Sequence, residues 1–378
     1  MVCSRPCGEE SGLRLGFSED QEELRRFVRQ FLEDKSPESA VRDLMQTERG
    51  YDDAAWCQMA EQLGLQGIAI EERYGGGGFT FRELALVLEE MGRALLCAPF
   101  FSTVVLAAGA LSRSGDEAAC EELLPAIASG DCIATLAFEE DDDSNGAVAV
   151  ADGTGWRLRG EKTYVLDGHV ADVVLVVART PKGLGLVRCS GDAEALQREL
   201  LPTLDLTRKQ ARLTFSGTPA VAVGRLGDGA ATLEVVLQLA AAALAAEQVG
   251  GTQRCLDMAV TYAKERMQFG RPIGSFQAIK HRCADLLLEA ETARSAAYYA
   301  AWCAASGDDD LPVAAAMAKA HCSDAYYHSA AENIQIHGGI GFTWEHPAHL
   351  YFKRAKASQL MFGDPAHHRA RLAGLVGL

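Results

Sequence analysis

A polar stretch between two helix-like segments, residues 262–277, carries side chains suited to binding a phosphate group and a flat ring. Arg266 presents a planar fork of donors that matches a pair of phosphate oxygens. Gln268 can hydrogen-bond near the edge of a ring, and Phe269 can stack on its face. A surface salt bridge and an ordinary helix–helix connection use the same residue types, so this stretch alone specifies no ligand.

A second stretch, residues 335–343, contains glycines that a closely fitting ligand requires. Gly338 and Gly339 have no side chains, which allows a ligand to approach the backbone. Gly338 is equally suited to end a helix, because glycine readily takes the left-handed conformation of a helix cap. Both interpretations stay open on this stretch alone.

Glu247 is an acid isolated in an apolar, helix-like run that extends from Ala243 to Val249. An unpaired carboxylate is costly in such surroundings. Acids with perturbed surroundings are enriched at active sites, which makes Glu247 a candidate general base. The alternative is a buried glutamate paired with an arginine of another helix, such as Arg254 or Arg282.

Two familiar nucleotide-binding patterns are missing from the sequence. The glycine run at 75–78 is not followed by the lysine and hydroxyl residue of a phosphate loop, and it is better interpreted as a turn. No GxGxxG pattern opens a strand–helix unit, so we expect no Rossmann site. The histidines lack the spacing of metal ligands, and we predict no metal site.

The elements that must position these residues change type twice along the chain. Residues 1–130 have the apolar periodicity of helices, and residues 131–226 contain short β-favouring runs separated by Gly, Asp and Pro. Residues 227–378 return to long helical patterns, which pack naturally as a bundle. The middle part is typical of an antiparallel sandwich or barrel. The sequence thus predicts an α+β multidomain protein.

Composition excludes several classes of partner. The 378 residues carry a net charge of −16, which argues against nucleic acid or an anionic membrane surface as the main partner. No apolar run approaches the length of a membrane span, and the N-terminus has no apolar core typical of a secretory signal. Most of the eleven cysteines stand singly. A cytoplasmic protein with reduced cysteines is the expectation.

The two polar stretches together resemble the acyl-CoA dehydrogenase family. That family carries R-x-Q-F-G-x-P-I-x-x-F-Q and Q-x-x-G-G-x-G-[YF] motifs, which match residues 266–277 and 335–342 in the same order. The resemblance covers nearly the whole chain. It implies an N-terminal α-helical domain, a middle β-barrel and a C-terminal four-helix bundle. It also implies an FAD at a subunit interface, where the motifs of one subunit contact the FAD of its neighbour through Arg266, Gln268, Phe269, Gln335, Gly338 and Gly339.

The activity that the resemblance implies is α,β-dehydrogenation of an acyl-CoA thioester. A carboxylate removes the α-proton, the flavin N5 accepts the β-hydride, and an electron-transfer flavoprotein reoxidises the flavin. The base must lie in a dry cleft, where desolvation raises its pKa toward the range that proton abstraction requires. Family members work as oligomers, and a tetramer is expected here.

This sequence departs from the family at both known positions of the base. Phe362 stands where many members carry the glutamate, and Ala240 stands at or near the position used by a second group. Glu247 shares the helix face of Ala240 and lies roughly 10 Å further along it. It is therefore the residue that we predict as the catalytic base.

The passage that usually holds the flavin ring also differs. Phe138 and Glu139 replace its Thr-Glu pair, and residues 164–167 replace the following Trp-containing passage. This favours an alternative, in which the chain is a non-catalytic or half-site subunit that completes the FAD site of a partner. The heteromeric dehydrogenases of bacterial sterol side-chain degradation have the asymmetry that such a role needs. An oxidase or monooxygenase of the same fold stays open as well.

Overall fold

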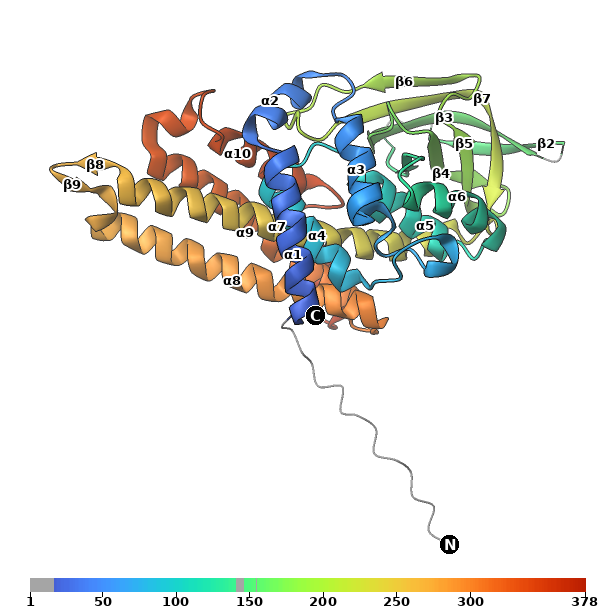
Figure 1. Ribbon diagram of the computed structural model, residues 1–378. Helices are drawn as coiled ribbons and strands as arrows, with labels where there is room; N and C mark the ends of the chain where they lie inside the picture. Colours follow the sequence, from blue (N-terminus) through green and yellow to red (C-terminus); the bar gives the residue numbers. More distant parts are fainter. Residues whose placement is uncertain (1–16, 141–145, 154) are drawn as a thin grey trace, which may run out of the picture.

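The computed structural model describes residues 17–140, 146–153 and 155–378. Helices precede and follow the sheet in the sequence, and the sheet lies at one end of the molecule (Figure 1). Cys3, Cys7 and residues 141–145 of the altered flavin passage lie outside the described residues. The nine described cysteines are free thiols. The predicted order of helices, strands and helices is confirmed.

The first helical part owes its elements to caps and apolar stripes. Ser18 and Gln21 form a capping box at the start of the first helix, and Thr80 and Glu83 form another. The segment Phe101–Ala107, termed η3, is a π-helix and is entirely buried. The elements are α1 (Glu19–Lys35), α2 (Glu38–Gln46), α3 (Asp53–Leu63), η1 (Leu65–Gly67), η2 (Glu72–Tyr74), α4 (Phe81–Ala94), η3, α5 (Ala108–Arg113) and α6 (Glu117–Ala128).

The middle part is a seven-stranded sheet whose order is β1-β4-β2-β3-β7-β5, with β6 paired to β7. An additional pairing of β4 with β5 closes five of these strands into a barrel. Most pairs are antiparallel as predicted, but β1 runs parallel to β4. The strands are β1 (Ala134–Ala137), β2 (Val148–Asp152), β3 (Gly155–Leu166), β4 (Val173–Thr180), β5 (Gly183–Ser190), β6 (Leu196–Leu200) and β7 (Gln210–Val223).

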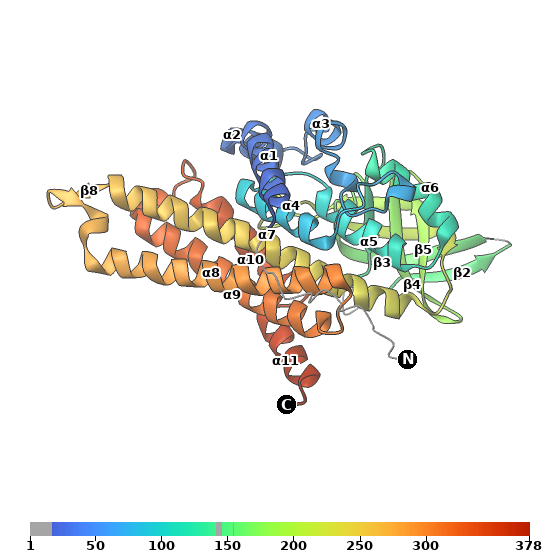
Figure 2. The ribbon, with the colours of Figure 1, turned by 60° about the horizontal axis from the view of Figure 1, so that its bottom comes forward.

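The last part is a bundle built around α7, a helix of 37 residues from Gly229 to Glu265. Small side chains allow α7, α8 and α9 to pack closely, and their shared core consists largely of alanines. Figure 2 shows these helices side by side along most of their length. The remaining elements are β8 (Met267–Gln268), β9 (Arg271–Pro272), η4 (Ile273–Ser275), α8 (Gln277–Ser306), α9 (Leu311–His337), η5 (Gly338–Phe342), α10 (Ala348–Leu360) and α11 (Pro365–Leu375).

Two features bear on the predicted boundaries and on the membrane. The proposed boundaries at 131 and 227 fall between α6 and β1 and between β7 and α7, and the division into three domains stays a prediction. By length and composition α7 alone could cross a membrane, among the helices of the described residues. It packs against α4, α8 and α9, which is the setting of a core helix.

Candidate active site

A mainly apolar pocket of about 430 Å³ lies between the sheet and the end of α10. The ends of β1 and β3 form one wall, and residues 202–205 with the start of β7 form another. The end of α10 and the turn after it, up to Phe362, close the pocket. The pocket thus joins the middle part to the bundle, at the passages that the sequence marked as altered.

Phe362 lines this pocket where the resemblance places a catalytic glutamate. Its ring stacks on Phe101 of η3 at 5.7 Å between centroids, and it lies 6.2 Å from the ring of Phe138. The backbone of Phe362 has a φ of 58°, a left-handed conformation that the next residue, Gly363, continues. Two aromatic side chains, Phe138 and Phe362, therefore line the part of the pocket where the resemblance places a carboxylate, and Phe101 stacks on Phe362.

Two buried basic residues hold this turn. The ammonium of Lys319 donates to the carbonyl oxygens of Gln359 and Gly363 at 3.2 and 3.1 Å. Burial lowers the pKa of Lys319 to about 8. The Nε2 of His368 donates to the carbonyl oxygen of Phe362 at 2.9 Å, and burial lowers the pKa of this histidine to about 4. The aromatic turn is thus fixed from α9 on one side and α11 on the other.

Glu139 lines the pocket next to Phe138, and Asp205 is a second carboxyl group of the lining. Glu139 is half-buried, and burial raises its pKa. Lys162 bonds instead to Glu140 at 2.6 Å and to the carbonyl oxygen of Phe138 at 3.0 Å. From the sequence, Glu139 was named only as the residue at a family position. Nothing in the sequence indicates whether Lys162 pairs with Glu139 or with Glu140.

Glu247 lies behind the pocket, in a buried ion network. Its two carboxylate oxygens accept hydrogen bonds from Arg208 and, at 3.1 Å, from Arg354. Arg354 also donates to Asp205 at 2.7 Å. Asp205, Glu247 and Arg354 are all at most 4% exposed. The suggested partners were wrong: Arg282 pairs with Glu332, and Arg254 has no ion pair with Glu247 among the described contacts.

The partners of Glu247 come from elements that sequence reasoning did not connect with it. Arg208 and Asp205 stand in the loop before β7, and Arg354 stands on α10. The only available signal was the charged sequence from Asp205 to Lys209 in front of a β-favouring run. Ala240, the other position considered for the base, is fully buried in the core.

The six predicted cofactor residues lie at the far end of the bundle. Arg266, Gln268 and Phe269 are exposed in the β8–β9 hairpin, which projects from that end in Figure 1. Gln335, Gly338 and Gly339 are exposed where α9 ends and η5 begins. The ring of Tyr262 on α7 stacks on that of His337 on α9 at 4.3 Å, which joins the two segments. We call this end of the bundle the C-terminal tip.

The tip lies far from Glu247 along α7. Nineteen residues separate Glu247 from Arg266, so at about 1.5 Å per residue the two are roughly 28 Å apart along the helix. Phe269 is 90% exposed with a φ of 53°, and a side chain added at Gly338 or Gly339 would meet no atom within 4 Å. The tip is therefore an open surface with an aromatic ring, an arginine and two uncovered glycines.

These arrangements differ in how well they suit an FAD. The tip offers a guanidinium for phosphate, an aromatic face and accessible backbone, so its residues fit contacts to an FAD held mainly by another subunit. At the family's positions for the flavin ring the pocket presents Phe138, Glu139 and Leu166, which offer no hydroxyl or amide donor, while Tyr164, Thr203 and Gln210 supply such groups elsewhere in its lining. The pocket therefore lacks the family's donors at these three positions but keeps polar side chains on its other walls.

Comparison with known proteins identifies the family. The sequence matches the models for "Acyl-CoA dehydrogenase, N-terminal domain" over residues 18–131 and "Acyl-CoA dehydrogenase, C-terminal domain" over residues 227–375. The chain belongs to the acyl-CoA dehydrogenase family. As predicted, it is a flavoprotein oxidoreductase of the class that uses FAD and acts on acyl-CoA.

Its similarity to individual proteins extends over nearly the whole chain. It is 36% identical to acyl-CoA dehydrogenase IpdE2 of Mycobacterium tuberculosis, over 95% of this chain and 98% of that protein. It is 34% identical to a chain of the Tcur3481-Tcur3483 steroid ACAD, with a TM-score of 0.86 over 96% of this chain and 99% of that one. The ChsE4-ChsE5 complex of M. tuberculosis matches at 29% identity and a TM-score of 0.88, over 97% and 99% of the two chains.

Proposed function

We propose that this chain is one subunit of a heteromeric acyl-CoA dehydrogenase, in which its C-terminal tip completes the FAD site of a different partner subunit. The observation that carries the proposal is the position of Phe362. Its ring packs between Phe101 and Phe138 in the pocket where this family needs a proton-accepting carboxylate. A phenyl ring accepts no proton, so the partner supplies the base.

The surroundings of Glu247 also support a base that comes from the partner subunit. A general base needs an oxygen free to approach the α-carbon of the substrate. Both oxygens of Glu247 already accept hydrogen bonds from Arg208 and Arg354. We infer that this carboxylate balances the two guanidiniums and ties the loop before β7 to α7 and α10.

At the tip, the residues of this chain bind and orient a cofactor. In the assembled enzyme FAD supplies the hydride acceptor for dehydrogenation. Arg266 would hold its phosphates with paired N–H donors, and Phe269 would cover an aromatic face of the cofactor. The open backbone at Gly338 and Gly339 would allow close approach.

Two of the similar structures strengthen the proposal. The Tcur3481-Tcur3483 steroid ACAD and the ChsE4-ChsE5 complex each bear the names of two different proteins. We propose the same kind of assembly here, acting on an acyl-CoA thioester in the cytoplasm. An electron-transfer flavoprotein is the proposed reoxidant.

The test is flavin content with and without the partner. We expect the chain purified alone to be colourless, and the complex with a co-expressed homologue to be yellow and to dehydrogenate an acyl-CoA. The double variant Arg266→Ala/Phe269→Ala should assemble less FAD per complex, while Arg113→Ala on the exposed side of α5 should not. A yellow homotetramer that an acyl-CoA bleaches anaerobically would refute the proposal.

The competing proposal keeps Glu247 as the base of a self-sufficient dehydrogenase. It rests on the burial of this carboxylate on the bundle helix that passes behind the pocket. Glu247→Gln then abolishes turnover while FAD stays bound and the fold keeps its stability. Under the heteromer proposal the same substitution acts on stability instead, and this difference separates the two proposals.

A further inference from the structure

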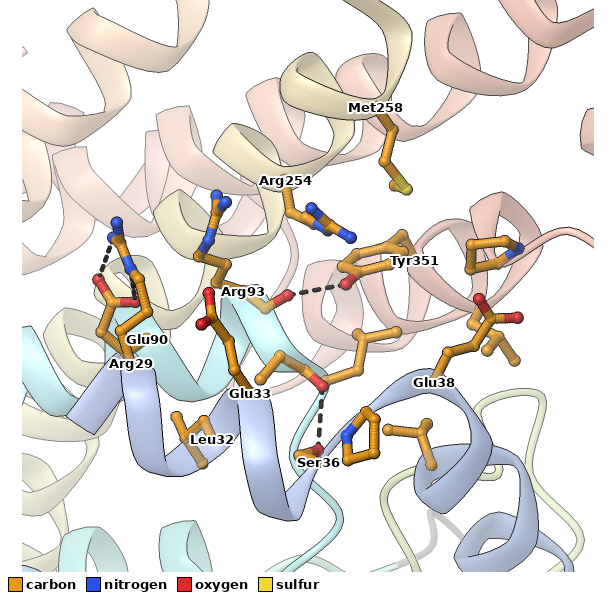
Figure 3. A pocket seen from close by; sticks show the side chains of 16 residues that line it. Arg29, Leu32, Glu33, Ser36, Glu38, Glu90, Arg93, Arg254, Met258 and Tyr351 are labelled. Atoms are coloured by element: carbon orange, nitrogen blue, oxygen red, sulfur yellow. Dashed lines mark hydrogen bonds and ion pairs between the residues drawn. The ribbon is translucent and has the colours of Figure 1, made fainter. Parts of the chain in front are cut away.

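A second cavity of about 260 Å³ lies where the N-terminal helices meet the bundle. Residues of α1, α2, α4, α7 and α10 line it, as Figure 3 shows. It shares no lining residue with the pocket that contains Phe362. Neither the family motifs nor the proposed function assigns it a role.

Most of the charged groups around this cavity are already paired. Arg29 donates to both oxygens of Glu90, at 2.8 and 2.7 Å. Arg93 pairs with Asp257 at 2.7 Å, and Glu38 accepts from Arg42 at the same distance. These pairs cancel in charge and leave little attraction for a ligand.

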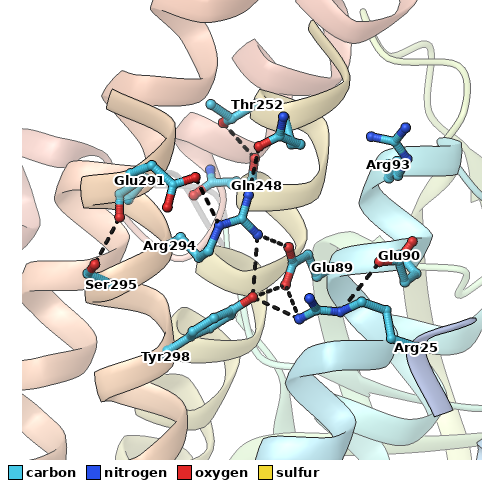
Figure 4. A network of polar contacts seen from close by, with 12 residues as sticks. Arg25, Glu89, Glu90, Arg93, Gln248, Thr252, Glu291, Arg294, Ser295 and Tyr298 are labelled. Atoms are coloured by element: carbon cyan, nitrogen blue, oxygen red, sulfur yellow. Dashed lines mark hydrogen bonds and ion pairs between the residues drawn. The ribbon is translucent and has the colours of Figure 1, made fainter. Parts of the chain in front are cut away.

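The adjoining polar network shows the same rule of pairing. Arg25 and Arg294 both donate to Glu89, which also accepts from the hydroxyl group of Tyr298 at 2.7 Å (Figure 4). Each guanidinium of that network has a carboxylate within reach. In this region a cation without a carboxylate partner is therefore an exception.

Arg254 is a cation that has no carboxylate partner in the described part of the chain. It is half-buried on α7 and lines the cavity, and among the described residues no carboxylate lies within 4 Å of it. Its neighbour is Tyr351, whose hydroxyl group donates to the carbonyl oxygen of Arg93 at 2.7 Å. Burial raises the pKa of Tyr351 to about 12, so the phenol stays neutral and gives Arg254 no counter-charge. A guanidinium with unused donors in a cavity suits a carboxylate or phosphate.

The remaining lining decides between these two anions. Apolar side chains form much of the wall, among them Leu32, Val41 and Met258. Glu33 lines the same cavity, and its negative charge disfavours a ligand with more than one negative charge. The volume is slightly below the range of about 300–1,000 Å³ typical of drug-sized ligands. A short apolar chain with one carboxylate satisfies all three conditions.

We propose that this cavity binds a small organic monocarboxylate, with its carboxylate on the guanidinium of Arg254 and its apolar part against Leu32, Val41 and Met258. The ligand would bridge α7 and α10 of the bundle to α1 and α2 of the N-terminal part. The proposal is independent of the heteromer and of the flavin, since it uses none of their residues.

The site can be tested by isothermal titration calorimetry with sodium hexanoate. The protein is the full chain or its complex with the partner. We expect hexanoate to bind and Arg254→Gln to raise its Kd by at least about tenfold, the loss of one charged hydrogen-bonding group. Arg254→Lys should give a smaller increase, because it keeps the charge but loses the fork. Arg113→Gln is the matched control, and its Kd should equal that of the unsubstituted chain.

Three outcomes would overturn the proposal. The first is no heat of binding with hexanoate at concentrations up to about 10 mM, which corresponds to negligible affinity. The second is binding that Arg254→Gln and Arg254→Lys leave unchanged, which would place hexanoate elsewhere. The third is binding of inorganic phosphate, and not of hexanoate, with the same dependence on Arg254. Thermal melts of each variant verify that the protein titrated is folded.

Discussion

Replacing Glu247 with glutamine removes one negative charge from a buried group of two carboxylates and two guanidiniums. In the native protein Glu247 and Asp205 balance Arg208 and Arg354. Glutamine has nearly the same shape, but its amide presents one acceptor and one donor to two donor groups. One arginine contact is therefore lost, and the network is left with an uncompensated positive charge.

The size of the effect follows from burial. Asp205 and Arg354 are each 2% exposed and Glu247 is 4% exposed, so water cannot take the place of the missing carboxylate. Removing one partner of a buried ion pair costs about 3–5 kcal/mol, against a total stability of about 5–15 kcal/mol for a typical protein. The substitution should thus remove a large fraction of the free energy of unfolding.

Urea unfolding followed by circular dichroism measures this loss as a lower midpoint at an unchanged slope. Glu234→Gln on the same helix is the control, because its ion pair with Arg371 is at the surface and contributes about 0–1 kcal/mol. A Glu247→Gln protein that unfolds within about 0.5 kcal/mol of the unsubstituted chain would refute this account of the network. If that protein also lost turnover with its FAD bound, Glu247 would be the base.

The other predictions concern the turn after α10, the contact between α4 and α7, the helix α5 and the C-terminal tip. The pKa of His368 falls to about 4 on folding, from about 6.5 in the unfolded chain, so stability should decrease as the pH falls between these values. Unfolding of the unsubstituted chain and of His368→Gln, measured across this pH range, checks the expectation, since the variant should lose less stability as the pH falls. Gly250→Ala should cost more than about 1–3 kcal/mol, because its Cβ would lie 1.8 Å from the carbonyl oxygen of Glu89. Gly109→Ala, whose Cβ meets nothing within 4 Å, should raise the melting temperature slightly. Phe269→Ala should leave the melting temperature of the isolated chain unchanged and weaken FAD retention in the complex, because this ring is 90% exposed.

Local features of the sequence predicted local structure well. The capping box of Ser18 and Gln21 is present, and apolar periodicity identified the helices on both sides of the sheet. The strand texture of the middle part was recognised too. Its closure into a barrel was expected from the resemblance and is confirmed. The parallel pairing of β1 with β4 was not predicted, because strand order depends on contacts between distant segments.

The surroundings of Glu247 show why the site resisted the same reasoning. Arg208 lies 39 positions before it and Arg354 lies 107 positions after it, so no local pattern connects the three. The apolar neighbours of Glu247 indicated burial, which is correct. They could not distinguish a base from a counter-ion, since either role places a carboxylate in a dry setting. The same is true of Arg254, whose lack of a carboxylate appears only in three dimensions.

The continuity of α7 has a consequence for how the protein can change over evolution. The helix spans 37 residues, or about 55 Å, without a break, and it ends directly in the hairpin that carries Arg266 and Phe269. Each residue turns a helix by about 100°, so deleting one residue would rotate the hairpin away from the cofactor that it is proposed to meet. Insertions or deletions of about seven residues nearly restore the rotation, to within roughly 20°, but they move the hairpin by about 10 Å. Length changes should therefore be far rarer in α7 than in the loops of the sheet, and a homologue with an altered α7 should carry a matching change in its partner.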